Sequence, residues 1–276
     1  MNYIHCHFEL SEPIPWSEIL ITYLAQIDFE SFEQNEIGVE AYIQKPQFSE
    51  DKVKKVLENI QTEVSFNHKE IEDENWNAEW EKNFSPIYID NLCIIRAPFH
   101  EKEEGFDQEI IINPQMSFGT GHHQTTYLIM KAMFGTDFEN KTVLDMGSGT
   151  GILAILAEKL GCKGAVAIDI DEWAYHNTID NLELNRCSKI EVKEGGAELL
   201  VDNDKYDTVL ANINRNILTN DMEYYAKSMK KGAVIYFSGF YTSDISIIEK
   251  SANSHGLTMI NSAEREGWAM VTFSKN

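Results

Sequence analysis

Residues 143–151 spell Val-Leu-Asp-Met-Gly-Ser-Gly-Thr-Gly, and the apolar run Ile152-Leu-Ala-Ile-Leu-Ala157 follows at once. This pattern predicts a buried strand, a turn with glycines at alternate positions, and then a helix. Gly147, Gly149 and Gly151 lack a Cβ atom, so the turn can adopt positive φ angles and approach a ligand closely. The unpaired N–H groups that begin a helix lie beside the turn. We therefore expect a ligand site here.

Two acidic side chains indicate which ligand this glycine turn would hold. Asp145 stands just before the turn, and Asp169 ends the next apolar strand, 22 positions after Gly147. A carboxylate at the position of Asp169 suits the ribose hydroxyls of a nucleoside. Dinucleotide enzymes favour the spacing G-x-G-x-x-G, and a carboxylate at their turn would repel the pyrophosphate. The spacing G-x-G-x-G after an acidic residue instead favours S-adenosylmethionine, which carries an ammonium, a sulfonium and a ribose.

Composition limits the classes of protein that the chain can be. With 276 residues and 43% hydrophobic content, the chain is expected to form about two ordinary domains. The net charge is −22, and residues 1–85 hold 18 Asp or Glu against 6 Lys or Arg. Nucleic-acid binding is not expected, because phosphates demand basic side chains. The acidic first part would attract a basic protein partner, and surplus carboxylates that only keep the protein soluble are the alternative.

Neither membrane insertion nor secretion is expected. No apolar run approaches the roughly 20 residues of a membrane span, and the first residues show no secretion signal. The cysteines form no C-x-x-C pair, so reduced thiols are expected at Cys6, Cys93, Cys162 and Cys187. We expect a cytoplasmic protein, with a monomer as the default state.

The first 70 residues predict a small α+β domain. Strands are expected at 3–10, 31–34, 39–43 and 64–68, with helices at 16–27 and after Ser49. This order, strand-helix-strand-strand-helix-strand, is that of a ferredoxin-like module. The acidic segment 71–85, with Trp76 and Trp80, is expected to be a linker.

Residues 86–276 predict an α/β domain. Short strands at 87–98 and 108–113 come first, and seven strands follow, most of them separated by helices, at 142–145, 165–170, 190–192, 206–212, 233–239, 257–263 and 268–274. The alternation indicates a mostly parallel, Rossmann-like sheet covered on both faces. The last two strands are too close for a helical crossover, so they should form an antiparallel hairpin.

A second glycine motif, Ser117-Phe-Gly-Thr-Gly-His-His-Gln-Thr-Thr126, precedes the first. Its glycines permit a sharp bend, and Thr125 or Thr126 can cap the helix that follows. We interpret the motif as a flap that closes over the cofactor, with Thr126 supplying a hydroxyl; a plain loop with a capping threonine is the alternative. The candidate cofactor-binding residues of the flap are Phe118, Gly119, Thr120 and Gly121.

Metal binding by the flap is not expected. The adjacent His122 and His123 have no Cys, Asp or Glu beside them at the spacing of metal ligands.

Asn212 ends the predicted strand 206–212. Ligands of open α/β sheets lie beyond the carboxyl ends of the strands, so Asn212 should lie near Gly147. An amide can accept a hydrogen bond without adding charge, which suits a site where an amine approaches a sulfonium. We expect Asn212 to orient the amine, with His123 as a second catalytic candidate. A turn-forming asparagine is the alternative.

Four segments together closely resemble the PrmA family, the lysine methyltransferases of the large-subunit ribosomal protein numbered eleven. The segments are Phe118–Thr126, Val143–Ala154, Ala167–Asp171 and Ala211–Ile213. Further similarity to the family's interdomain segment and tail lies at Trp76–Phe84 and Glu266–Val271. The G-x-G-x-G turn occurs across class I methyltransferases. The flap motif is therefore the part of the resemblance that is specific to the PrmA family.

The resemblance implies a class I methyltransferase domain preceded by a ferredoxin-like domain that recognises the ribosomal protein. It implies that Thr126, Gly147, Asp169 and Asn212 contact S-adenosylmethionine. His122-His123-Gln124 stands where the family has Thr-His-Pro, so His123 matches the family's histidine. The implied activity is N-methylation of lysine side chains, with the N-terminal amine as a further acceptor. A methyltransferase of another protein or a small molecule, and a non-catalytic cofactor-binding adaptor, are the alternatives.

Overall fold

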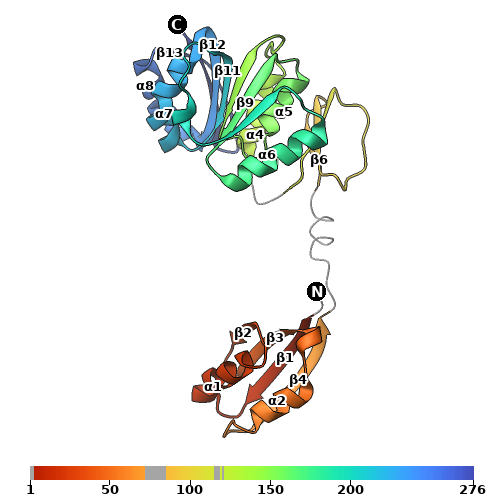
Figure 1. Ribbon diagram of the computed structural model, residues 1–276. Coiled ribbons are helices and arrows are strands. Elements are labelled where there is room, and N and C mark those ends of the chain that lie inside the picture. The colour runs from red at the N-terminus through yellow and green to blue at the C-terminus, as the bar shows by residue number, and fades with distance from the viewer. Residues whose placement is uncertain (1–2, 72–84, 115–118, 120) are drawn as a thin grey trace. The chain divides into compact units, whose positions relative to one another are not determined.

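The computed structural model describes residues 3–71, 85–114, 119 and 121–276 (Figure 1). The chain forms two compact units, Met1–Phe84 and Ser85–Asn276, which are described separately. Most of the linker expected at 71–85 lies outside the described residues, as do Phe118 and Thr120 of the flap.

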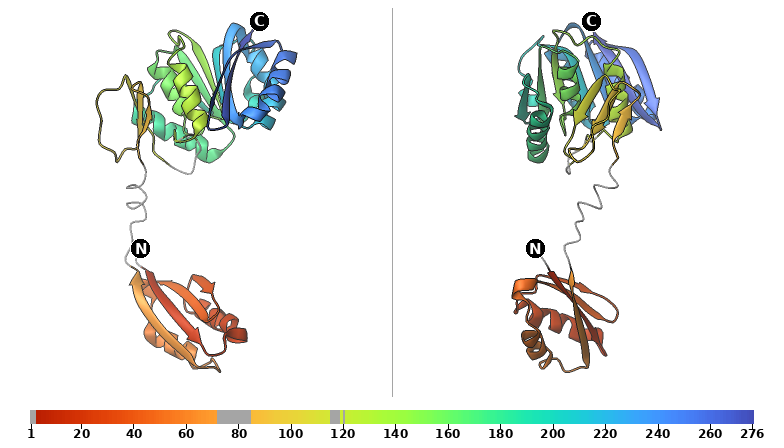
Figure 2. Two further views of the ribbon diagram at one scale, coloured as in Figure 1. Left: turned by 180° about the vertical axis from the view of Figure 1, so that it is seen from behind. Right: turned by 90° about the vertical axis from the view of Figure 1, so that its right-hand side faces the viewer.

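The N-terminal unit contains the elements in the order that the sequence predicts. They are β1 (Tyr3–Leu10), α1 (Pro13–Ala25), β2 (Ser31–Gln34), β3 (Gly38–Gln44), η1 (Lys45–Gln47), α2 (Glu50–Leu57) and β4 (Val64–Ile71). The strands form one antiparallel sheet in the order β2-β3-β1-β4. Alternate residues of β1 are buried with apolar residues of α1 and α2, so both helices cover one face (Figure 2). Ser49 caps α2 by accepting from the Lys52 amide at 3.5 Å.

The C-terminal unit begins with a small sheet of β5 (Ile87–Ile89), β6 (Cys93–Arg96) and β7 (Gln108–Ile111). The single strand expected at 87–98 is wrong, because the chain turns back between β5 and β6, and Asp90 adopts a φ of 47° there. The two strands pair antiparallel, and β7 joins β6 in parallel. The strand expected at 108–113 ends at Ile111.

The main sheet has seven strands in the order β10-β9-β8-β11-β12-β14-β13. Neighbouring strands from β10 to β12 pair in parallel, whereas β14 pairs antiparallel with both β12 and β13, which confirms the expected antiparallel hairpin at the end. The strands are β8 (Thr142–Met146), β9 (Gly164–Asp169), β10 (Ile190–Glu194), β11 (Tyr206–Asn212), β12 (Met229–Tyr241), β13 (Leu257–Arg265) and β14 (Trp268–Lys275).

Helices cover both faces of this sheet (Figure 1). On one face lie α4 (Gln124–Met133), α5 (Ile152–Lys159) and α6 (Glu172–Asn185). On the other lie η2 (Ala197–Leu199), α7 (Arg215–Ser228) and α8 (Ile245–Ser254), and the short η3 (Thr242–Asp244) leads into α8. Side chains of β8 alternate between the two cores, with Val143 in the first and Leu144 in the second.

The strand order reverses between β8 and β11, because the chain proceeds from β8 to one edge of the sheet and then returns to β11. Leu210 pairs with Asp145 and Ala211 with Met146, so the carboxyl ends of the two strands lie side by side. A crevice at such a reversal is the usual ligand site of open α/β sheets.

No helix in the described part of the chain is long and apolar enough to cross a bilayer. All four cysteines are free. Burial raises the pKa of the Cys6 and Cys93 thiols to about 12, which makes them poor nucleophiles at neutral pH.

Candidate functional site

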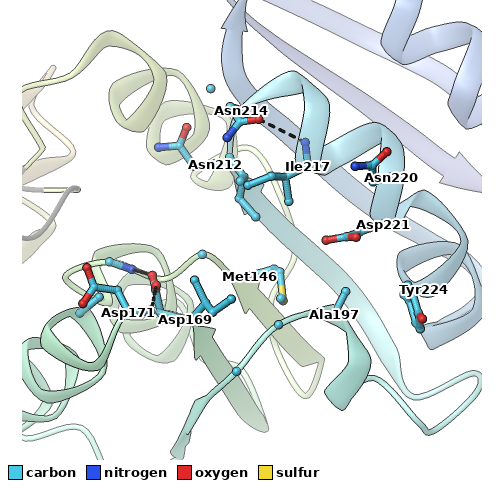
Figure 3. Close-up of a pocket in the computed structure, with 18 of the residues that line it drawn as sticks. Met146, Asp169, Asp171, Ala197, Asn212, Asn214, Ile217, Asn220, Asp221 and Tyr224 are labelled. Atoms are coloured by element: carbon cyan, nitrogen blue, oxygen red, sulfur yellow. Dashed lines mark hydrogen bonds between the residues drawn. The ribbon is translucent and has the colours of Figure 1, made fainter.

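A cavity of about 880 Å³ opens at the carboxyl edge of the parallel strands (Figure 3). Its walls come from the turn after β8, the end of β9, the turn after β10, the end of β11, helix α7 and the start of β14. This volume is within the ordinary range for small-molecule sites. The cavity therefore lies where the strand order predicts a ligand.

The glycine turn after β8 forms the floor of this cavity. Gly147, Gly149 and Gly151 have φ angles of 68°, 56° and 77°, a region that side chains disfavour. A Cβ atom on Gly147 would lie 2.7 Å from Cγ1 of Ile213, and one on Gly151 would lie 2.8 Å from Cγ2 of Thr178. Gly147 and Gly149 line the cavity. Gly151 instead begins α5 and lets it pack closely against α6.

Asp169 lines the cavity and holds the glycine turn in place. Its Oδ2 accepts from the Gly149 amide at 2.8 Å, and its Oδ1 accepts from the Asp171 amide at 3.1 Å (Figure 3). Each carboxylate oxygen has a further lone pair, so the side chain can still accept from ligand hydroxyls. The geometry fits the expected ribose contact.

Asp145 lies beneath the turn rather than in the cavity wall. Like Val143, it projects from the face of β8 that α5 covers, and it is 1% exposed. Its Oδ2 accepts from the Ala154 amide at 3.0 Å, while its Oδ1 has no partner among the described residues. Burial, with a smaller contribution from Asp169, raises the pKa of Asp145 to about 7. The sequence placed this carboxylate against the ligand, whereas the structure places it in support of α5.

His123 is the N-cap of α4, so the expectation that Thr125 or Thr126 caps this helix is wrong. Nδ1 of His123 accepts from the Thr125 amide at 3.3 Å and lies 2.7 Å from the Thr125 hydroxyl. The ring lines the cavity, and burial lowers its pKa below the usual value. Because Nδ1 is the acceptor, the proton of the neutral ring is on Nε2.

The described part of the flap contacts the glycine turn. The Gly119 carbonyl accepts from the Thr150 hydroxyl at 2.6 Å. Gly119 and Gly121 have φ angles of 101° and 94°, and a Cβ atom on Gly121 would lie 3.0 Å from Cδ1 of Ile87. The flap glycines are therefore needed for both conformation and close packing.

Asn212 lines the cavity at the end of β11, as the sequence predicted. Its Nδ2 donates to Oγ1 of Thr126 at 3.2 Å, and its buried Oδ1 has no partner in the described part of the chain. Thr126 is 1% exposed and stands behind Asn212 rather than in the cavity lining. An acceptor oxygen is thus held at the site without a hydrogen-bond partner from the residues that the structure describes.

Sequence reasoning missed an aromatic part of the wall. Trp268, at the start of β14, stacks on Tyr241 with centroids 4.2 Å apart and meets His123 edge-on at 4.4 Å. The predicted hairpin could have indicated this, because a strand that returns antiparallel begins at the carboxyl edge of its parallel neighbours. The pair Gly195-Gly196 after β10 was missed as well, although the rule that found Asn212 applies to it.

The cavity wall is negatively charged. Its carboxylates are Asp169, Asp171, Glu198 and Asp221, and neither Lys nor Arg occurs in the lining that the structure describes. Such a wall repels a pyrophosphate and attracts a cation. Together with the glycine turn and the Asn212 acceptor, which has no partner in the described part of the chain, this wall fits S-adenosylmethionine.

Similarity to known proteins agrees with this chemistry. The family model described as Ribosomal protein L11 methyltransferase (PrmA) matches residues 18–276. Proteins named ribosomal protein L11 methyltransferase are similar at 45% identity over 262 residues in Bacteroides thetaiotaomicron (94% of each chain) and 46% over 261 residues in Bacteroides fragilis (93% of each chain). The crystal structure of a ribosomal protein L11 methylase from Lactobacillus delbrueckii subsp. bulgaricus is similar with a TM-score of 0.65 at 26% identity, over 70% of this chain and 100% of that one. The chain therefore belongs to the PrmA family of ribosomal protein L11 methyltransferases.

Proposed function

We propose that this protein transfers methyl groups from S-adenosylmethionine to amines of ribosomal protein L11, chiefly those of lysine side chains. The observation that carries the proposal is Asn212 in the wall of a negatively charged cavity, where its buried Oδ1 has no hydrogen-bond partner among the described residues. A neutral acceptor at that place can hold an amine without forming a salt bridge that would keep it protonated. The family membership supports both the reaction and the substrate.

The cofactor, when bound, supplies a methyl group on a positively charged sulfur. Gly147 and Gly149 offer a close backbone surface to it, and Asp169 offers lone pairs to its ribose. Thr126 acts through Asn212, while Asp145 and Gly151 act through helix α5. For the flap residues Phe118, Gly119, Thr120 and Gly121, the proposed role is exclusion of water.

The acceptor amine must lose its proton before it can attack. A lysine pKa near 10.4 makes the neutral form cost roughly 5 kcal/mol at pH 7. Desolvation within the cavity lowers this cost, because burial disfavours the charged form of an amine. Asn212 Oδ1 then accepts from an amine N–H and directs the lone pair toward the reacting carbon.

His123 is better suited to shape the wall than to act as a base. Its Nδ1 is occupied by the start of α4, and its Nε2 carries a hydrogen in the neutral ring. A donor at Nε2 does not take a proton from the amine. We therefore propose Asn212 as the catalytic residue and His123 as a positioning residue.

Mass spectrometry of L11 incubated with the full chain and S-adenosylmethionine tests this function. We expect methylated lysines with the wild type and a large loss with Asn212→Ala. If the donor binds but L11 stays unmodified, the methyltransferase of another substrate or the non-catalytic adaptor becomes the better interpretation. The same spectra give the number and positions of the methyl groups.

We also propose that the N-terminal unit is a ferredoxin-like module that docks L11. Its element order and its antiparallel sheet order β2-β3-β1-β4 support the fold. The excess of 18 acidic over 6 basic residues in residues 1–85 supports attraction of a basic partner. Residues 85–276 alone should keep their donor affinity and lose methylation of L11; full activity would exclude the docking role. We propose a cytoplasmic monomer as the acting form, and sedimentation tests the monomer.

A further inference from the structure

We propose that binding of the methyl donor releases a proton from Asp145, the carboxyl buried under the glycine turn. This inference rests on the proposed cofactor. It assigns to Asp145 a role as a sensor of positive charge in the cavity, and not a contact with the ligand.

The surroundings of Asp145 offer its carboxyl little compensation. The side chain is 1% exposed, with one hydrogen bond from the Ala154 amide to Oδ2 and no partner for Oδ1 within the described residues. A buried carboxylate normally has a cation or several donors, because transfer of an unpaired charge from water is expensive. This carboxyl has a single amide, so in the free protein the protonated form is favoured.

The described residues packed around β8 bring no cation to this carboxyl. From β9, Asp169 adds a further negative charge. From β11, the residue paired with Asp145 is the apolar Leu210. The charged groups of α5, Glu158 and Lys159, belong to its last turn, at the opposite end of the helix from the Ala154 amide. Burial and the Asp169 charge together raise the pKa of Asp145 to about 7.

A cationic ligand in the cavity would supply the missing positive charge. Met146 and Gly147, the two residues after Asp145, both line the cavity. A nearby positive charge favours the ionised carboxyl. The O–H bond of Asp145 then breaks, the electron pair stays on the carboxylate, and the proton passes to the buffer. Donor affinity consequently rises with pH up to about the pKa of the free carboxyl.

Isothermal titration of the full chain with S-adenosylmethionine, in two buffers of different ionisation enthalpy, counts the released protons. At pH 6.5 the donor's own amine, with a pKa near 7.7–8.0, stays protonated and contributes little. We expect more than about half a proton per donor for the wild type, and severalfold tighter binding at pH 8 than at pH 6. Asp145→Asn, which keeps an acceptor for the Ala154 amide, should release close to none.

Asp180→Asn is the matched control, because it removes the same charge from an exposed position on α6. It should release as many protons as the wild type. Release that persists in Asp145→Asn, or donor binding by the wild type without release, overturns the proposal. If Asp145→Asn does not fold, the wild type alone decides: release should fall severalfold between pH 6 and pH 7.5, where most of the donor's amine is still protonated, and a constant value refutes the coupling. Absence of any donor binding would instead overturn the proposed function.

Discussion

Asn212 and Thr126 are 86 positions apart in the sequence, yet Nδ2 of the asparagine donates to Oγ1 of the threonine over 3.2 Å. The bond joins the end of β11 to the first turn of α4, the helix that follows the flap. It also fixes the amide so that Oδ1, rather than Nδ2, is the atom for which the described residues offer no partner. The orientation of the amide that we propose to be catalytic is therefore set by a residue outside the cavity lining.

Removal of this bond should slow methyl transfer without unfolding the protein. We expect Thr126→Val to lower kcat about tenfold, because the amide can then rotate, and Asn212→Ala to lower it about 100-fold. Thr126→Ser keeps the hydroxyl and should stay close to the wild type. Steady-state kinetics on intact L11 measures all three variants. A near-normal kcat for Asn212→Ala would remove this residue from the mechanism.

A methyl group on the glycine turn should destabilise the protein by two separable effects. Gly147→Ala imposes a side chain at a φ of 68°, at about 1–2 kcal/mol, and forces Ile213 to move. Gly232→Ala has a similar φ of 76° with no atom within 4 Å of the new Cβ, so it isolates the conformational cost. Urea unfolding should show a larger loss for Gly147→Ala, and calorimetry should show weaker donor binding for that variant alone. Equal losses would contradict the close packing at Ile213.

The capping role of His123 predicts a different outcome for two substitutions. His123→Ala should lower the free energy of unfolding by about 1 kcal/mol. His123→Asn should leave that free energy close to the wild-type value, because asparagine is a good N-cap. We expect His123→Asn to keep kcat within about tenfold, since α4 and Thr126 stay in place. Thermal unfolding and kinetics measured side by side test this. Equally severe losses of kcat in two stably folded variants would make the imidazole itself part of the reaction.

Asp145 should make stability depend on pH in the direction opposite to a salt-bridged carboxyl. Its pKa is about 7 in the folded protein against an ordinary 3.8, so the unfolded chain loses this proton first. The free energy of unfolding therefore falls as pH rises from about 4 to 7, by on the order of 4 kcal/mol in total. Asp145→Asn should remove that fall. Urea unfolding at pH 5, 6.5 and 8 measures it, and an unchanged pH dependence in the variant argues against a protonated native carboxyl.

Much of this site could be predicted from one rule, that ligands of open α/β sheets lie at the carboxyl ends of the strands. Gly147, Asp169 and Asn212 each stand at the end of an apolar strand, and parallel strands bring such ends to a common edge. The class of sheet followed from the alternation of strands and helices. The order of elements in the N-terminal unit followed from the same periodicities.

The features that the sequence did not predict depend on contacts between distant segments. The position of Asp145 along β8 was correct, but its burial depends on α5 covering that face. His123, Thr125 and Thr126 are all near the start of α4, and the usual preference for N-cap residues favours threonine over histidine. The break between β5 and β6 is an exception, because it falls at the polar pair Asp90-Asn91, where Asp90 adopts a positive φ, and these local turn residues could have indicated it. Trp268 reaches the cavity only through its register opposite Tyr241.

Because of how β11 pairs with its neighbours, the number of residues in this strand matters for function. Leu210 lies opposite Asp145, and Asn212 opposite Ser238. Because successive side chains of a strand point to opposite faces, the loss or gain of a single residue between 206 and 212 would turn the amide away from Thr126. Substitutions in this strand can preserve catalysis, whereas insertions and deletions cannot. We therefore expect members of the family to differ in the amino acids of this strand while the number of its residues stays the same.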